Sequence, residues 1–210
     1  MRMKLFELQR PYDLVMSLGY NCMTAYQLKR LSLRSFSGPV DWVIIHEVSD
    51  LIRLLDNRFQ GYMEEQNLKI LGTHNGYFSV QDTEYKAHSF HDFPCSGGNQ
   101  TIANYSEFKE KLDRRISRFI SLAAQADSAL FVRERCSYED AVRLRDSLAS
   151  LVKGKTHLLI INYTREGRLV EHNWVDDGIC SVDVNLDVDD EFLRDSYWND
   201  AFRGVSLIQK

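Results

Sequence analysis

The sequence predicts a single α/β domain over residues 1–210, built as three layers around a mostly parallel central sheet. Short apolar runs alternate with amphipathic helical patterns at both ends of the chain, as they do in α/β proteins. A strand–helix–strand series runs from Ala129 to Ile161, and such βαβ units pair their strands in parallel. A chain of 210 residues can bury a sizeable core, and no shift in composition divides it into two domains.

The first predicted elements are a strand, a sharp turn and a helix. The apolar run Asp13–Leu18 has the length and flanks of a strand that is buried on both faces. Gly19 permits a sharp turn after it, and apolar residues at helical spacing follow over Ala25–Leu31. Asn21 is a favourable N-cap, so Cys22 falls in the first turn of this helix.

The middle of the chain is predicted to be rich in β-structure. Val40–Ile45 fits either a strand or a buried loop, and Val48–Leu55 has the spacing of a second helix. The pattern from Leu68 to Phe93 is β-like, and Asn75-Gly76 within it is a strong hairpin signal. We expect this stretch to form a β-hairpin excursion at the edge of the main sheet or over its active face.

The second half of the chain alternates helices with strands. Residues 94–100 are expected to form a flexible loop. The elements expected after it are, in chain order, a helix over Phe108–Ala123, a strand over Ala129–Arg133, a helix over Ala141–Leu151, strands over Leu158–Ile161 and Ile179–Val184, and a helix over Glu191–Phe202.

Composition and charge argue against several classes of function. The chain has 26 Lys+Arg against 30 Asp+Glu, which is not the basic footprint of a nucleic-acid-binding protein. The densest basic stretch, Lys109–Arg118, is interleaved with acidic residues, which is typical of a solvated helix face. No stretch approaches the roughly 20 apolar residues of a membrane span, and no signal peptide is recognisable. The four cysteines form no CxxC pair, so we expect free thiols in a cytoplasmic protein.

Cys22 is the best candidate for a reactive residue. In the first turn of a helix, its thiol would lie beside unpaired backbone N–H groups and the positive end of the helix dipole. Both favour the thiolate, so we expect a depressed pKa and a nucleophilic sulfur. The same N–H groups would stabilise an oxyanion, and the end of a buried strand is where open α/β sheets bind ligands. The alternative is that Cys22 is simply a small packing residue.

A cysteine nucleophile needs a base, and His91 is the best candidate among the six histidines. His88 and His91 stand three residues apart on a predicted strand, so they would point to opposite faces, and His91 is nearer the strand end. Asp41 is a carboxylate inside an apolar run and needs a partner if buried, which His91, Arg34 or a backbone amide would provide. Asp92 is an alternative group for orienting the imidazole.

The sequence predicts neither a metal nor a cofactor. His88-x-x-His91-Asp92 superficially resembles a ligand cluster, but histidines on opposite strand faces chelate poorly, and no CxxC or HExxH motif supports it. The glycine patterns that cradle nucleotide phosphates are also absent.

Several motifs together resemble a bacterial family of unknown function whose members are described as papain-like cysteine peptidases. They are SLGYNC at Ser17–Cys22, GPVDW at Gly38–Trp42, HDF at His91–Phe93 and the strand Leu130–Arg133, and the likeness extends over most of residues 12–165. Val40 stands where the family is expected to have Phe. The resemblance implies a Cys22 nucleophile, with His91 as base and an acidic or amide third member.

We therefore expect a thiol-dependent hydrolase that acts on an acyl or peptide carbonyl. Cys22, His91 and Asp41 are the predicted catalytic residues, and Asn21, Trp42 and Arg133 are predicted to bind the substrate. That substrate would be a small molecule, a peptide or a glycan. The alternatives are an acyl- or glycan-modifying transferase linked to surface-polysaccharide synthesis, and a non-catalytic binding module. A papain-like α+β fold is the alternative architecture, although the buried strand before Cys22 and the later βαβ unit favour α/β.

Overall fold

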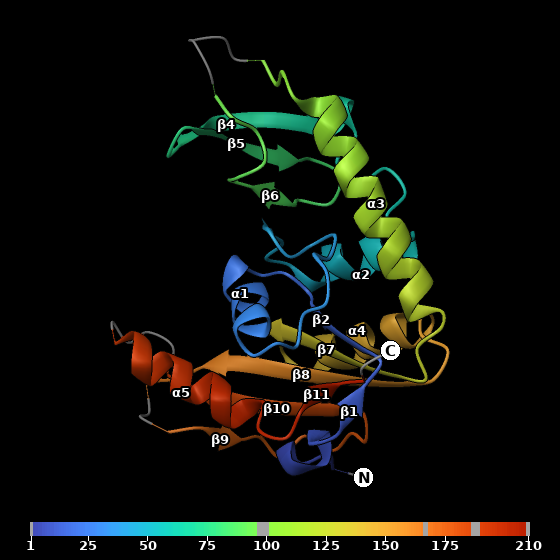
Figure 1. Cartoon of the computed structure of the whole chain (residues 1–210), viewed down its shortest axis with the longest axis vertical. Coiled ribbons are helices and arrows are strands. Elements are labelled where there is room, and N and C mark those ends of the chain that lie inside the picture. The colour runs from blue at the N-terminus through green and yellow to red at the C-terminus, as the bar shows by residue number, and fades with distance from the viewer. Residues whose placement is uncertain (1, 96–100, 166–167, 186–189, 209–210) are drawn as a thin grey trace.

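The computed structural model describes residues 2–95, 101–165, 168–185 and 190–208 (Figure 1). Its central sheet has five strands. In spatial order these are β2 (Leu14–Ser17), β7 (Ser128–Glu134), β8 (Lys155–Tyr163), β10 (Ile179–Val184) and β9 (Val170–Glu171). The first four strands are parallel and β9 is antiparallel to β10, so the predicted α/β class with a mostly parallel sheet is confirmed.

Helices cover both faces of this sheet and make three layers. On one face, α1 (Cys22–Arg30) and α5 (Glu191–Ala201) pack in a core cluster that includes Leu130 and Val132 of β7. On the other face, α2 (Val48–Asp56) and α4 (Tyr138–Ala149) pack in a cluster that includes Phe131. The alternation of neighbouring β7 residues between two clusters follows from the pleat of a strand.

The β-rich middle of the chain forms a second sheet of four antiparallel strands. Its spatial order is β3 (Val43–Ile44), β6 (His88–Ser89), β5 (Tyr77–Asp82) and β4 (Leu68–His74). Asn75 and Gly76 take φ values of 47° and 81° and make the predicted hairpin turn between β4 and β5. Of the two positions expected for this excursion, the edge of the main sheet is excluded, because these strands pair only with each other among the described residues.

A long helix joins the two sheets. α3 (Tyr105–Ala123) runs from the antiparallel sheet to the parallel one (Figure 1). Near its start, the ring of Phe108 lies 4.5 Å from that of Phe93, and near its end, the ring of Phe119 lies 6.3 Å from that of Phe131. One apolar stripe on α3 therefore holds both sheets, and residues of both belong to one core cluster.

Among the described residues, three two-residue strands, β1 (Pro11–Tyr12), β9 and β11 (Ser206–Leu207), lie outside the predicted elements. β1 and β11 pair in parallel and bring the two ends of the chain together. Two-residue strands carry no periodicity, which explains why the sequence did not predict them. The expected loop over residues 94–100 lies mostly outside the described residues. Within the described part of the chain, no helix has both the length and the apolar character to cross a membrane.

Candidate active site

The turn before α1 places Cys22 at the carboxyl edge of the parallel sheet. β2 ends at Ser17, and the chain then passes through Gly19 and Tyr20, whose φ values are 75° and 78°. A Cβ at Gly19 would come within 3.3 Å of the carbonyl oxygen of Val40, so only glycine fits this close approach without strain. The Asn21 side chain accepts a hydrogen bond from the N–H of Met23 at 2.7 Å, and Cys22 is the first residue of α1. Both features confirm the prediction.

The helices that follow β2 and β7 pack on opposite faces of the sheet. β2 and β7 are neighbours in the sheet, but α1 follows β2 on one face and α4 follows β7 on the other. Open α/β sheets bind their ligands at the carboxyl ends of the strands, which is the edge where β2 and β7 end. Cys22 stands at the start of the first of these helices.

The turn is stabilised by a buried carboxylate that was not predicted from the sequence. Glu134 is fully buried at the end of β7 and accepts hydrogen bonds from the hydroxyls of Thr24 and Tyr163 and, at 3.2 Å, from the amide of Asn21. Burial raises the pKa of Glu134, and these three hydrogen bonds oppose the rise. Asn21, predicted to bind substrate, thus caps α1 and ties it to β7. The available signal was a charged residue directly after a buried apolar strand.

Arg133 is an internal brace between the strand, the turn and the loop before α2. Its guanidinium is 0% exposed and donates to the carbonyl oxygens of Leu18 at 3.0 Å, Ile45 at 2.6 Å and His46 at 3.0 Å. Burial lowers the pKa of Arg133 to about 10. The predicted contact with substrate would require this side chain to become exposed, whereas its present bonds shape the backbone around Cys22.

The electrostatic surroundings of Cys22 are opposite to those expected. The thiol is half-buried, and burial raises its pKa, as do the nearby carboxylates of Asp92 and Asp41. The predicted depression of the Cys22 pKa was therefore wrong. Helix position is local and readable from sequence, whereas burial and two carboxylates from distant segments are tertiary features. The same result shows that the segments carrying Asp41 and Asp92 both approach Cys22.

Asp41 forms a buried ion pair in the loop between α1 and β3. The carboxylate is 1% exposed and accepts hydrogen bonds from Nε of Arg34 and from the N–H of Gly38, both at 2.8 Å. These are two of the three partners considered for it. Among the described residues Asp41 has no hydrogen bond to His91. Trp42 is half-buried, and the Arg34 guanidinium lies 5.1 Å from the centre of its ring.

His91 lies beyond the strand on which it was predicted. β6 ends at Ser89, so the argument that His88 and His91 face opposite sides of one strand was wrong. The His91 side chain is exposed, and its ring centre lies 6.3 Å from that of Tyr77. Asp92 beside it accepts a hydrogen bond from the Ser89 hydroxyl at 2.8 Å.

No histidine is hydrogen-bonded to Cys22 in the described part of the chain. Nε2 of His88 lies 3.1 Å from the hydroxyl oxygen of Ser79, and burial together with the charge of His46 lowers the His88 pKa. His46 is exposed, and its ring packs edge-on to Tyr20 with the ring centres 5.6 Å apart. His91 and His88 thus both lie at the antiparallel sheet that faces the Cys22 side of the molecule.

A search of the described residues finds no group of three His, Cys, Asp or Glu side chains placed to hold a metal ion. The four cysteines are unpaired: Cys22 and Cys95 are half-buried, while Cys136 and Cys180 are buried.

Comparison with known proteins identifies the family. Residues 13–164 match the family described as "Putative papain-like cysteine peptidase (DUF1796)", and since this is well over half of the chain, the chain belongs to that family. A protein of Acanthamoeba polyphaga mimivirus, described as uncharacterized, is 27% identical over 183 residues, which cover 78% of this chain and 82% of the viral protein. This relative is viral rather than bacterial. No solved structure matches the chain at a significant level.

Proposed function

We propose that this member of the papain-like cysteine peptidase family is a thiol-dependent hydrolase in which Cys22 attacks an acyl or peptide carbonyl. One observation carries the proposal. Cys22 begins a helix at the carboxyl edge of a parallel sheet, and the carboxylate of Asp92, next to His91 in the chain, is close enough to raise the pKa of the thiol. These features support a thiol nucleophile at Cys22 with a base supplied by the neighbouring segment.

The raised pKa of Cys22 defines how the reaction would start. The sulfur would be a protonated thiol at neutral pH, so a base must remove its proton as it attacks. His91 is the proposed base, since it is exposed and forms no hydrogen bond within the described part of the chain. The thiol proton moves to His91, the sulfur–carbon bond forms, and the proton then passes to the leaving group. Water hydrolyses the resulting thioester.

The carboxylates have separate roles in this proposal. Asp92 adjoins His91 and supplies the negative charge that would stabilise the imidazolium. Asp41, bonded to Arg34 and Gly38, would act as a positioning residue that holds the loop beside Cys22. The N–H groups in the first turn of α1 would stabilise the oxyanion of the tetrahedral intermediate.

Reaction with electrophilic probes tests this proposal. A panel of vinyl sulfone, epoxide and acyl-CoA analogues is applied to the wild type and to Cys22→Ala, His91→Ala and His88→Ala. Cys95→Ala is the matched control, because Cys95 is also a half-buried free thiol. We expect loss of labelling in Cys22→Ala and a loss of about a hundredfold or more in His91→Ala at neutral pH, with the control unchanged.

The pH profile separates a base from a residue that merely supports the structure. If His91 is the base, its removal matters less at high pH, where the Cys22 thiol ionises without help. A constant defect at every pH would remove His91 from this role, and a selective defect in His88→Ala would transfer the role to His88. Labelling by the acyl-CoA analogue alone would favour the alternative of a transferase. No labelling of Cys22 by any probe would favour the alternative of a non-catalytic binding module.

A further inference from the structure

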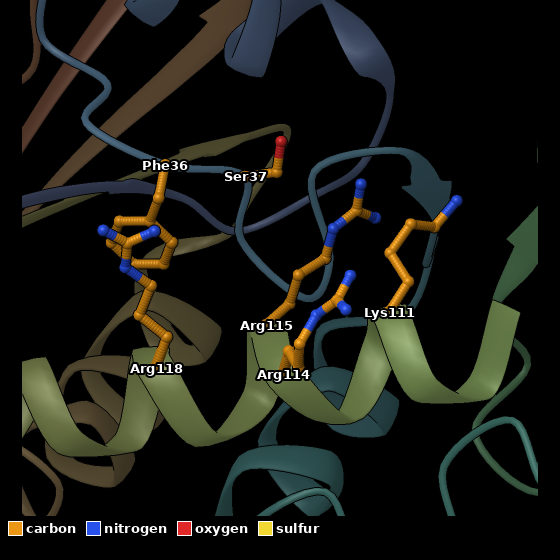
Figure 2. Close-up of a pocket in the computed structure, with 6 residues that line it drawn as sticks. All are labelled: Phe36, Ser37, Lys111, Arg114, Arg115 and Arg118. Atoms are coloured by element: carbon orange, nitrogen blue, oxygen red, sulfur yellow. The ribbon is translucent and has the colours of Figure 1, made fainter. Parts of the chain in front are cut away.

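A basic pocket lies between α3 and the loop that precedes β3. Its volume is about 360 Å³, and it is lined by Phe36, Ser37, Lys111, Arg114, Arg115 and Arg118. Figure 2 shows the four cationic side chains rising from α3 on the side that faces the Phe36–Ser37 segment. We propose that this pocket binds the phosphate group of a phosphorylated small molecule. The proposal goes beyond the thiol hydrolase activity and does not depend on it.

The positive charges of this pocket are only partly balanced by the protein. Lys111 and Arg114 each pair with a carboxylate, at N–O distances of 3.3 Å and 3.2 Å. Arg115 and Arg118 form neither an ion pair nor a hydrogen bond within the part of the chain that the structure describes. Two positive charges are left over, which matches a phosphate monoester with a charge of about −1.5 to −2 at neutral pH. A single carboxylate would neutralise only one of them.

Arg115 is the half-buried cation of the pocket that has no hydrogen bond or ion pair within the described residues. Its side chain is half-buried, and its positive charge acts on Asp41, where it opposes the effect of burial on the pKa of that carboxyl. Because the Arg115 guanidinium donates no hydrogen bond within the described residues, its N–H groups are available to a ligand. Phosphate oxygens match the fork of donors on arginine, so a bound phosphate would satisfy Arg115.

Phe36 gives the pocket an apolar wall. The guanidinium of Arg118 lies 5.0 Å from the centre of the Phe36 ring, so the ring holds this exposed side chain over the pocket. Lys109–Arg118 was predicted to be a solvated helix face, and Arg114 and Arg118 are indeed exposed, but this stretch also lines a pocket. The helical period brings four cationic side chains of this stretch toward the Phe36–Ser37 loop. The sequence alone did not predict where that loop lies.

Binding of simple phosphates tests the proposal. Isothermal titration calorimetry with inorganic phosphate and with phenyl phosphate is carried out on the full chain at constant ionic strength, with acetate as the carboxylate comparison. We expect the wild type to bind both phosphates and to bind acetate far more weakly. Arg115→Gln should weaken phosphate binding at least about tenfold, because a charge-assisted contact is lost. Arg118→Gln, on an exposed side chain, gives a second variant should the first fail to fold.

Arg143→Gln is the matched control, because Arg143 is an exposed arginine of α4, outside the pocket lining, paired with Asp140. It should bind phosphate as the wild type does, and so should Cys22→Ala, which separates this proposal from the hydrolase. No phosphate binding by the wild type at millimolar concentration would overturn the proposal. Equal binding by the wild type and both pocket variants would also overturn it, as would acetate binding as tight as phosphate.

Discussion

The two sheets of the molecule are buried in different ways. In the parallel sheet, β7 is buried from Ala129 through Glu134 and β10 is buried at five of its six residues. In the antiparallel sheet, β5 alternates between buried and half-buried residues, and five of the seven residues of β4 are exposed. The difference follows from the connections, because helical crossovers cover both faces of a parallel sheet while a hairpin leaves one face open.

The two sheets hold the proposed nucleophile and its proposed base in place to different degrees. Cys22 follows a strand in the buried sheet and is fixed by Asn21, Glu134 and Arg133. His91 follows a two-residue strand of the open sheet and is exposed. The buried sheet thus determines where the sulfur lies, whereas the exposed side chain of His91 is held by fewer contacts.

Core truncation should distinguish the two sheets most strongly. Phe131→Ala, at a fully buried position of β7, should lower the free energy of unfolding by about 3–5 kcal/mol, since it leaves a cavity in the core. Leu71→Ala, at a position of β4 that is 47% exposed, should change it by less than about 0.5 kcal/mol. Urea denaturation measures both. Similar losses at the two sites would show that the open sheet is as tightly packed as the buried one.

The buried ion pair at the junction of the two sheets should have the next largest effect. Arg34→Met leaves the buried carboxylate of Asp41 with only the Gly38 amide, and we expect a loss of about 3 kcal/mol in unfolding free energy. Arg143→Met removes an exposed pair and should cost at most about 1 kcal/mol. Equal costs, measured by the same denaturation, would mean that Asp41 is already neutral in the folded protein.

A histidine in the buried sheet should make the stability depend on pH. His157 of β8 is 5% exposed and lies 3.1 Å from the Tyr12 hydroxyl, and burial lowers the His157 pKa to about 4. Because the folded pKa lies below that of the unfolded chain, the unfolded state binds the proton first, and stability falls as the pH drops from about 6.5 to about 4. The full contribution is at most about 3 kcal/mol.

His157→Gln should reduce this loss of unfolding free energy at low pH, because the amide keeps an acceptor for Tyr12 but does not titrate. His74→Gln, at an exposed position of β4, should leave the pH dependence of the unfolding free energy unchanged. Chemical denaturation at a series of pH values measures both variants. If the wild type and His157→Gln lose the same unfolding free energy at low pH, the pH dependence comes from other groups.

The smallest expected effect concerns the hairpin of the open sheet. Gly76 has a φ of 81°, so Gly76→Ala should cost about 1 kcal/mol in unfolding free energy even though no atom lies within 4 Å of an added Cβ. Gly72→Ala, in the same hairpin and equally unobstructed but without a positive φ, should cost less. A larger loss at Gly72 would locate the strain at the irregular pairing between Ile70 and Gly72 instead.

Local signals in the sequence were sufficient for the elements around Cys22. The apolar run before Gly19, the capping side chain of Asn21 and the helical spacing of Ala25–Leu31 each act over a few residues, and the structure has the strand, turn and helix as predicted. The Asn75-Gly76 hairpin and the βαβ unit from β7 to β8 were predictable for the same reason. Local backbone preferences and the periodic burial of side chains are properties of contiguous sequence.

The sequence by itself therefore determined the α/β class, most helices and strands, and the place of Cys22 at a helix start. Only the tertiary structure decided that the β-rich middle is a separate sheet, that Glu134 braces the turn, and that Asp41 pairs with Arg34. It also decided that Asp92 and Asp41 raise the pKa of Cys22, against the local expectation. The physical reason is that burial and Coulomb interactions depend on which distant segments meet in space, and no local pattern encodes those distances.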